Sequence, residues 1–375
     1  MAVLLTAYTN RAVDEICEML CDAGLPFMRI GNPASCDPRF REYLSPTTHH
    51  PSPITQHPSP TIVVSTTSML QTRPYVFQLM HFSLCVVDEA SQILEPGIVG
   101  LLANASIDRF VLIGDYKQLP AVVQQSEEQA AVTEQCLRDI CLTDCRQSLF
   151  ERLIRWEAHE GRTQFVGTLR KQGRMHPQIA LFPNSHFYRQ EQIGVVPCPH
   201  QQAESLNYAL PAEDELDEVL KSRRVAFFPV RGEGEGGSRS NNAEARFVAD
   251  LLRRVHRFYG GRFVASKSVG VIVPYRNQIA TIREEISRLG IPELMDISID
   301  TVERYQGSQR DVIIYSFTIS RLYQLDFLTA NTFMEDGQPI DRKLNVALTR
   351  AREQMLMVGD PAVLSHNPLF QQLIK

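Results

Sequence analysis

The sequence predicts an α/β protein in which two domains each contain a parallel sheet. Its 375 residues exceed the roughly 100–200 that are usual for one domain. Short, almost entirely apolar runs end in polar residues, which is typical of strands buried on both faces of a parallel sheet. These runs form two series, so we expect a first domain over residues 1–162 and a second over residues 163–375.

The first series combines short strands with an amphipathic helix. Four apolar runs are its expected strands: Ala2–Leu5, Thr61–Val64, Leu84–Val87 and Phe110–Ile113. After Thr9 and Asn10, apolar residues recur at positions 13, 16, 17 and 20, and Gly24 follows. A cap, an i, i+3, i+4, i+7 stripe and a glycine stop predict a helix directly after the first strand.

The second series begins near Gln164 and has the same character. Four runs are its expected strands: Arg224–Phe228, Val269–Val273, Asp311–Phe317 and Met355–Val358. A helix is expected after Pro274, ending at Gly290.

Two polar stretches of this second half allow simple interpretations. Glu213–Glu218 is expected to be a surface excursion. Arg253–Lys267 reads as an amphipathic helix ending at Gly260, with a basic and aromatic nucleic-acid surface as the weaker alternative.

Composition limits the kind of partner. Lys and Arg number 38 against 43 Asp and Glu, a net charge of -5, so any contact with nucleic acid must be local. No apolar run approaches the roughly 20 residues that a membrane span needs. Eight cysteines without a secretory signal favour reduced thiols in the cytoplasm, and the spacing of Cys136, Cys141 and Cys145 matches neither zinc nor ferredoxin ligation.

Two neighbouring strands of the first series end in candidate catalytic residues. Asp88 and Glu89 follow one strand, where a first carboxylate can hold Mg²⁺ and a second can position an attacking water. Gly114, Asp115 and Gln118 follow the next strand, and a glutamine there can contact a terminal phosphate. Taken alone, a pair such as Asp88 and Glu89 is more often a cap or a solvated turn, and the second group can be an ordinary turn with Gly and Pro.

Arginines near two expected helix starts are candidates for stabilising a transferred phosphoryl group. They lie in Leu169–Pro177 (LRKQGRMHP) and Asn345–Arg352 (NVALTRAR). Surface salt bridging is the alternative for any one of them.

Taken together, DEAS, GDYKQLP, LRKQGRMHP, VPYRNQ, TVERYQGSQRDVII and NVALTRAR resemble, in order and spacing, the superfamily 1B helicases. This branch contains the nonsense-mediated-decay RNA helicases and the nuclease-helicases of DNA replication. The resemblance covers nearly the whole chain. It implies two RecA-like domains of the P-loop NTPase type that clamp ATP and Mg²⁺ between them and move along single-stranded DNA or RNA with 5′ to 3′ polarity.

The resemblance also implies a role for individual residues. Asp88 would be the Mg²⁺ carboxylate, Glu89 would act on water, and Gln118 would sense the γ-phosphate. Arg174 and Arg350 would be arginine fingers. The other residues expected at the nucleotide are Gly114, Asp115, Gln172, Gly307 and Gln309.

Strand contacts are implied at loop ends, where they grip phosphates without reading bases. The matching positions are Thr9, Asn10, Thr66, Pro274, Tyr275 and Thr301. A further segment of the family is matched by Ser238, Asn241 and Glu244, to which the resemblance assigns no firm role.

Three departures from the family pattern affect the expected activity. No G-x-x-x-x-G-K-[ST] string occurs, although in this family it precedes TAYTNRAVDEI. Gly173 stands where relatives commonly have a tyrosine that can stack on adenine, and Gln309 replaces a glutamate near the ribose.

We therefore expect a first domain that lacks the Walker A strand, loop and helix and leaves its sheet partly exposed. The chain would then be part of a longer ATP-dependent helicase, inactive or nearly so by itself. Two alternatives stay open: a non-catalytic module that binds nucleic acid or a partner, and, less well supported, a metal-dependent nuclease using Asp88 and Glu89.

Overall fold

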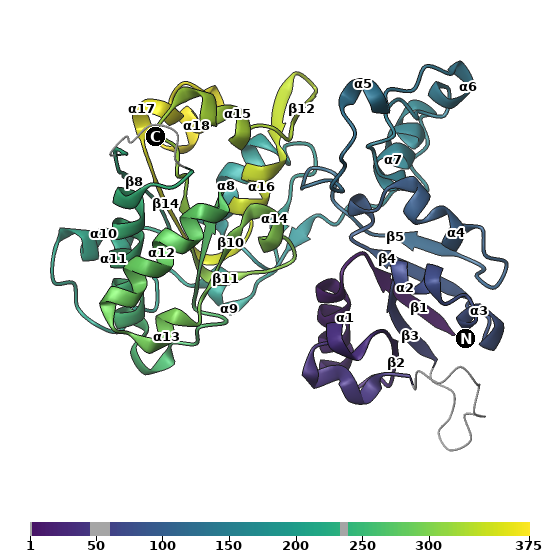
Figure 1. Ribbon diagram of the computed structural model, residues 1–375, viewed down its shortest axis with the longest axis horizontal. Coiled ribbons are helices and arrows are strands. Elements are labelled where there is room, and N and C mark those ends of the chain that lie inside the picture. Colours follow the sequence, from purple (N-terminus) through teal and green to yellow (C-terminus); the bar gives the residue numbers. More distant parts are fainter. Residues whose placement is uncertain (1, 46–60, 233–238) are drawn as a thin grey trace. The chain divides into compact units, whose positions relative to one another are not determined.

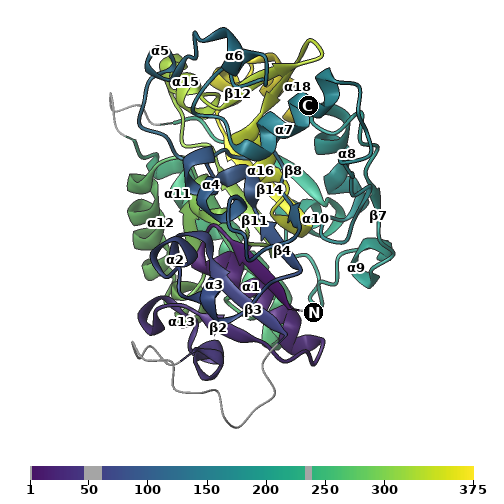
Figure 2. The same cartoon turned by 90° about the vertical axis from the view of Figure 1, so that its right-hand side faces the viewer.

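A computed structural model describes residues 2–45, 61–232 and 239–375. The chain divides into two compact units. Unit 1 comprises Met1–Tyr116 and Pro120–Gly167, and unit 2 comprises Lys117–Leu119 and Thr168–Lys375. Each unit is built on one five-stranded parallel sheet, so the predicted α/β class is confirmed (Figures 1 and 2).

The sheet of unit 1 has the strand order β2-β3-β1-β4-β5, with all neighbours parallel. Its strands are β1 (Val3–Ala7), β2 (Met28–Ile30), β3 (Ile62–Thr66), β4 (Leu84–Asp88) and β5 (Phe110–Leu112). Ala7 is in register with Thr66 on one side and with Asp88 on the other. The polar residues that follow these three strands therefore meet at one edge of the sheet.

Helices cover both faces of this sheet. They are α1 (Asn10–Asp22), α2 (Thr67–Thr72), α3 (Val76–Leu79), α4 (Val99–Leu102), α5 (Glu127–Ala130), α6 (Gln135–Arg138) and α7 (Leu149–His159), with the 3-10 helices η1 (Pro33–Ser35), η2 (Pro38–Tyr43), η3 (Ala90–Gln92) and η4 (Glu95–Gly97). The predicted first helix is confirmed, because α1 buries the stripe at positions 13, 16, 17 and 20. It packs on Ala7 and Val64, while the opposite face, with Leu4 and Val87, packs on the other helices.

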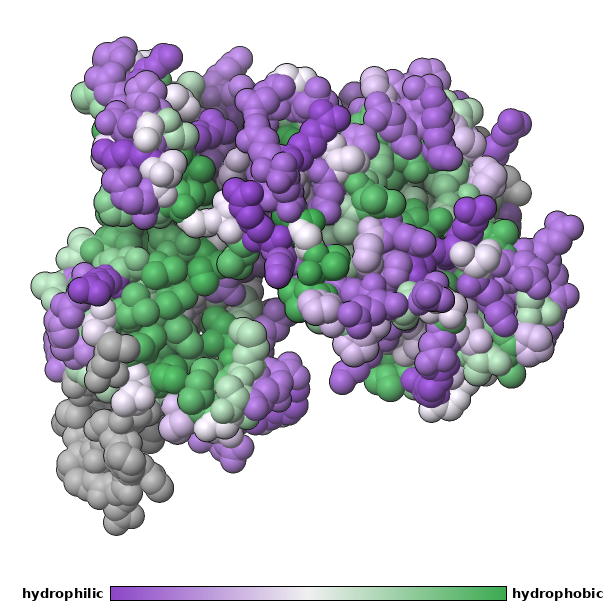
Figure 3. Space-filling model, turned by 180° about the vertical axis from the view of Figure 1, so that it is seen from behind, coloured by the Kyte–Doolittle hydropathy of each residue, from purple (hydrophilic) through white to green (hydrophobic). Residues whose placement is uncertain are grey.

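One end of this sheet is poorly covered. Among the described residues β5 pairs with β4 alone, and Val111 and Ile113 are 44% and 42% exposed. Seen from behind, apolar residues gather over unit 1 (Figure 3). This edge of the sheet is therefore partly exposed.

The sheet of unit 2 has the order β10-β9-β11-β14-β8 and is also parallel throughout. Its strands are β8 (Val225–Pro229), β9 (Val269–Val273), β10 (Ser298–Thr301), β11 (Arg310–Ser316) and β14 (Ala351–Gly359). All four expected strands are confirmed. The sequence did not predict β10, because a four-residue strand with one apolar side chain, Ile299, carries little periodic signal.

Unit 2 also has helices on both faces of its sheet. They are α8 (Pro177–His186), α9 (Pro199–Gln202), α10 (Glu215–Ser222), α11 (Asn242–Tyr259), α12 (Arg276–Leu289), α13 (Pro292–Met295), α14 (Val302–Tyr305), α15 (Leu325–Leu328), α16 (Arg342–Leu348), α17 (Pro361–Leu364) and α18 (Pro368–Leu373), with η5 (Gly260–Arg262) and η6 (Leu322–Gln324). Two small pairs complete the unit: β6 (Lys171–Gln172) with β7 (Gly194–Val195), and β12 (Thr332–Glu335) with β13 (Gln338–Asp341). The helix predicted after Pro274 is α12, which ends at Gly290 with a positive φ of 67°.

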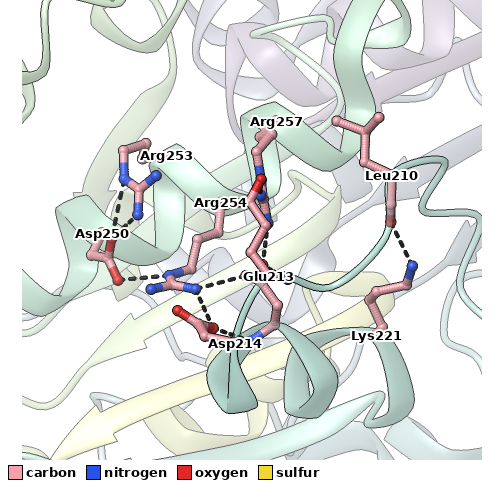
Figure 4. A network of polar contacts seen from close by, with 9 residues as sticks. Leu210, Glu213, Asp214, Lys221, Asp250, Arg253, Arg254 and Arg257 are labelled. Atoms are coloured by element: carbon pink, nitrogen blue, oxygen red, sulfur yellow. Dashed lines mark hydrogen bonds and ion pairs between the residues drawn. The ribbon is translucent and has the colours of Figure 1, made fainter.

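The stretch Glu213–Glu218 lies at the surface as predicted, since four of its six residues are exposed, but it is not an irregular excursion. Its last four residues begin α10, and Asp217 is fully buried against α11. Arg254 bonds Asp214, Asp217 and Asp250, each at 2.7 Å, and Arg257 pairs with Asp217 (Figure 4). The expected amphipathic helix is confirmed as the C-terminal part of α11, and Arg254 and Arg257 are paired with carboxylates within the fold.

Candidate functional site

Asp88 is the last residue of β4 and is only partly exposed. Burial raises the pKa of its carboxyl, and the backbone N–H of Glu89, 2.9 Å from Oδ1, partly offsets this effect. A bound cation would restore the ionised form. Because Mg²⁺ is typically held by one or two carboxylates together with substrate phosphates, a single well-placed carboxylate suits it.

Glu89 adopts the left-handed conformation, with φ 51° and ψ 35°. Non-glycine residues rarely do so, and such strain gathers at functional sites. The Gln92 side chain donates to Glu89 Oε2 at 2.8 Å and fixes its direction. The backbone thus turns sharply at the residue expected to act on water.

The loops after β4 and β5 pack closely and are joined by hydrogen bonds. A Cβ added at Gly114 would lie 2.8 Å from the backbone nitrogen of Ser91, so only glycine permits this approach. The Asp115 N–H donates to Ser91 Oγ at 3.3 Å, and Ala90 N–H donates to Ile113 O at 2.7 Å. Ser91, which is buried and lies in the DEAS string, is a supporting residue to which the sequence assigned no role.

The predicted strand-contact residues of unit 1 lie at the same sheet edge as Asp88. Thr9 caps α1 by accepting from Ala12 N–H at 3.1 Å, and Asn10 is the first helical residue. Thr66 caps α2 by accepting from Met69 N–H at 3.2 Å. Thr9 and Asn10 are exposed, whereas Thr66 is buried.

Gln118 lies in unit 2, although it follows a strand of unit 1. Its amide oxygen accepts from Arg350, whose nitrogen lies 2.9 Å away. Arg350 is only 2% exposed and also donates to Val346 O at 3.0 Å. The neighbouring Lys117 forms ion pairs with Glu191 and Glu335. The structure therefore brings together the predicted phosphate sensor and one predicted arginine finger.

The second predicted arginine is held in the same unit by two other predicted residues. The Gln172 amide oxygen accepts from the N–H groups of Arg174 and Met175, at 2.8 and 2.7 Å. Arg174 Nε donates to Gln309 Oε1 at 3.1 Å. Gly307 has a positive φ of 78° in the turn leading to Gln309.

A hydrogen bond to Thr349 O, at 3.3 Å, brings Arg174 to the residue that precedes Arg350. Gln172, Arg174 and Gln309 thus form one hydrogen-bonded cluster that reaches the residue next to Arg350. Gly173 has room for a Cβ, since the added atom would meet Cys198 Sγ at an ordinary 3.5 Å.

The remaining strand-contact residues of unit 2 follow two adjacent strands. Thr301 ends β10 in register with Val273 of β9, which Pro274 and Tyr275 follow. Tyr275 is 7% exposed, and its ring stacks on Phe327 with centroids 4.7 Å apart. Thr301 is likewise buried.

Glu244 is fully buried beneath this edge. It accepts from Ser316 Oγ, Thr318 N–H and Asn241 Nδ2, at 2.7, 2.9 and 3.0 Å. Burial raises the pKa of Glu244 to about 8. Asn241 N–H donates to Gln278 Oε1 at 2.7 Å, so the network joins α11, α12 and the end of β11. Glu244 therefore supports the edge from within, while Ser238 lies outside the described residues.

The remaining features of the described residues concern the requirements of a metal site, a disulfide and a membrane span. Within the described ranges, no group of three or more His, Cys, Asp or Glu side chains is arranged to hold a metal ion. All eight cysteines are unpaired. Over the same ranges, none of the helices has the length and apolar character needed to cross a membrane.

Comparison with known families defines the class of protein. Two models, each described as an AAA domain, match residues 145–362 and 58–126, and the first match covers more than half of the chain. The chain belongs to this AAA domain family, and its relatives place it among the superfamily 1 helicases.

The individual relatives are longer proteins. The chain is 30% identical to the DNA replication ATP-dependent helicase/nuclease DNA2 of Xenopus laevis, over 100% of the chain and 34% of that protein. It is 29% identical to the helicase/nuclease JHS1 of Arabidopsis thaliana, over 26% of that protein. An uncharacterized ATP-dependent helicase of Methanocaldococcus jannaschii is 26% identical over 84% of the chain and 41% of its own length. The chain thus spans about a third of the curated relatives it matches.

Among solved structures, the chain is similar to the Arterivirus nonstructural protein 10 helicase. The complex of that helicase with DNA has a TM-score of 0.43 and 15% identity, covering 96% of this chain and 54% of the viral one. A second structure of the same helicase gives a TM-score of 0.45 at 14% identity, covering 100% of this chain and 56% of the other.

Proposed function

We propose that this chain is the motor part of an ATP-dependent helicase or translocase that acts on single-stranded nucleic acid. The observation that carries the proposal is the contact between Gln118 and Arg350. A glutamine that can contact a terminal phosphate and an arginine that can stabilise its developing charge share one hydrogen bond. Because the two side chains share this bond, loss of the phosphate would change the contacts of both Gln118 and Arg350.

Unit 1 supplies carboxylate chemistry in this proposal. Asp88 would hold Mg²⁺, which neutralises charge on the phosphates when bound. Glu89 would orient the attacking water and accept its proton, from a backbone turn fixed by Gln92 and Ser91. Gly114 and Asp115 keep this turn in place.

Unit 2 supplies the phosphate-binding charge. Arg174 and Arg350 would stabilise the transferred phosphoryl group, with Gln172, Gly307 and Gln309 shaping the surface around it. With Gly173 in place of an aromatic residue, we propose that the base of the nucleotide is held weakly.

Each unit would contact the strand at the carboxyl ends of its own sheet. Thr9, Asn10 and Thr66 in unit 1 and Pro274, Tyr275 and Thr301 in unit 2 occupy these ends. Backbone amides and hydroxyls there suit phosphates, which every sequence presents alike. The relatives named for DNA replication make single-stranded DNA the first substrate to test.

The eight unpaired cysteines suit a reducing, cytoplasmic environment.

The test measures ATP hydrolysis stimulated by single-stranded DNA. It compares residues 1–375 with any longer form of the protein that carries a glycine-rich phosphate loop. Turnover in the longer form supports the motor. Strand binding without turnover in either form would support a non-catalytic binding module instead.

Glu89→Gln provides the sharper test in the active form. Turnover should fall by about 100-fold or more while ATP binding is retained, because the amide keeps the shape of Glu89 but cannot accept a proton. Glu128→Gln, an exposed change on α5 of the same unit, should turn over ATP at the normal rate. An active Glu89→Gln variant would remove Glu89 from its proposed role.

A further inference from the structure

A small cavity lies near the carboxyl ends of β9 and β11 in unit 2. Its lining residues are Arg239, Tyr275, Tyr323, Gln324 and Phe327, and its volume is about 280 Å³. Pockets for whole small molecules usually measure roughly 300–1,000 Å³, so this one suits part of a larger ligand. Three aromatic rings and one cation suit a flat, electron-rich group that carries negative charge nearby.

The floor of the cavity is preformed. The Tyr275 and Phe327 rings stack at 4.7 Å with 23° between their planes. Lys343 Nζ lies 3.9 Å from the Phe327 ring centroid and donates to Phe327 O at 3.1 Å. Phe327 is therefore held both by a ring and by a cation before any ligand binds, which reduces the ordering cost of binding.

Tyr323 provides an open ring beside this floor. Its side chain is 62% exposed, a large area for an aromatic residue with an apolar face. Its backbone is nevertheless fixed, because the buried Gln324 accepts from the N–H groups of Ser320 and Arg321 at 2.9 and 3.0 Å. The Tyr323 ring is therefore held in place and open to solvent, so a flat group can stack on it.

We propose that this pocket is a base-stacking subsite for one nucleotide of a bound single strand. Tyr323 stacks on the base, Tyr275 and Phe327 form the floor, and Arg239 contacts an adjacent phosphate. The inference rests on the proposed function and adds to it a base contact made by Tyr323, next to Tyr275, which is already among the proposed strand-contact positions. Since every base has a π face, the subsite tolerates any sequence, as a motor requires.

The location supports the same occupant. Tyr275 lines the pocket and follows Pro274 directly, so a strand held at Pro274 and Thr301 would pass the cavity. The cation at Arg239 complements a phosphate backbone.

The experiment measures binding of a fluorescently labelled oligodeoxythymidine to the full chain by anisotropy, over a range of salt concentrations. Tyr323→Ala should weaken binding about tenfold without changing its salt dependence, because stacking is lost and phosphate contacts are kept. Tyr323→Phe should bind like the unchanged protein. Leu322→Ala, at a 53% exposed position on the same 3-10 helix, controls for disturbance of η6.

A second experiment distinguishes stacking on a base from contacts with the phosphate backbone. A strand that lacks one base should bind the unchanged protein more weakly when the missing base is the one that would stack on Tyr323. The Tyr323→Ala variant should bind this strand and the complete strand equally. Arg239→Ala should instead lower the salt slope by about one.

Equal binding of Tyr323→Ala and the unchanged protein to every strand would overturn the subsite while leaving the proposed function standing. Failure of the unchanged chain to bind any single strand would contradict the proposed function itself, and the subsite with it.

Discussion

The loops at the carboxyl ends of the strands are held in different ways in the two sheets. In unit 1 the loops after β4 and β5 are held by close backbone packing of Gly114 against Ser91, next to the partly exposed strand β5. In unit 2 the inner strand β9 is buried along its whole length, and a buried carboxylate, Glu244, joins the neighbouring loops through hydrogen bonds.

This difference has a consequence for stability. Every residue of β9 is buried, whereas β5 leaves Val111 and Ile113 in contact with solvent. Apolar burial contributes roughly 25 cal/mol per Å², so side chains at the end of β5 contribute less to stability than those of the inner strand β9.

The largest expected effect contrasts two isoleucines. Ile314→Ala on β11 should lower the free energy of unfolding of unit 2 by about 2–5 kcal/mol, because it leaves a cavity in a fully buried site. Ile113→Ala, at a 42% exposed position after β5, should cost less than about 1 kcal/mol. Urea unfolding followed by hydrogen exchange assigns each loss to its unit, and equal losses would mean that the edge of unit 1 is covered in solution.

The second effect depends on pH. The folded pKa of Glu244 is about 8 against an ordinary 4.5, so between these values the folded state holds a proton that the unfolded state has lost. The contribution of protonated Glu244 to the stability of unit 2 is therefore fully present below pH 4.5. This contribution is lost as the pH rises to about 8, and the free energy of unfolding falls by up to about 1.4 kcal/mol per pH unit.

Burial also raises the pKa of Asp341 to about 6, which adds to this fall at the acid end of the range. Urea titrations from pH 5 to 8 measure the slope. Glu244→Gln should flatten it, and an unchanged slope would show that Glu244 does not titrate in this range.

The smallest effect concerns the glycine that joins the two loops of unit 1. Gly114→Ala should cost about 1–3 kcal/mol, because its Cβ would lie 2.8 Å from a backbone nitrogen. Gly100→Ala in α4, where the added carbon has nothing within 4 Å, should stabilise the protein by up to about 1 kcal/mol. Thermal unfolding of the two variants compares them, and tolerance of Gly114→Ala would show that the loops can move apart.

Much of the fold could be predicted because its signals are local. The apolar runs placed eight of the ten strands in the two main sheets, and the stripe after Asn10 predicted α1 together with its buried residues. The two missed strands, β2 and β10, have three and four residues and too few apolar positions to show a period.

The candidate site was predictable only in part. Asp88, Glu89 and Gly114 could be named because they follow apolar runs, but the contact of Gly114 with Ser91 has no signature in the sequence. Glu213–Glu218 looked like solvated charge, since its partners on α11 lie about 40 residues further along the chain.

The sequence by itself determined the α/β class, the two series of strands and the residue types that end them, because each depends on neighbours within a few positions. Only the tertiary structure decided which polar residues meet. Arg350 finds Gln118 across 232 positions of sequence, and Glu244 finds Thr318 across 74. The second pairing forms at the carboxyl end of β11, because a parallel sheet brings together the ends of strands that are distant in the chain. The first pairing forms because the chain after β5 packs against the turn between α16 and β14.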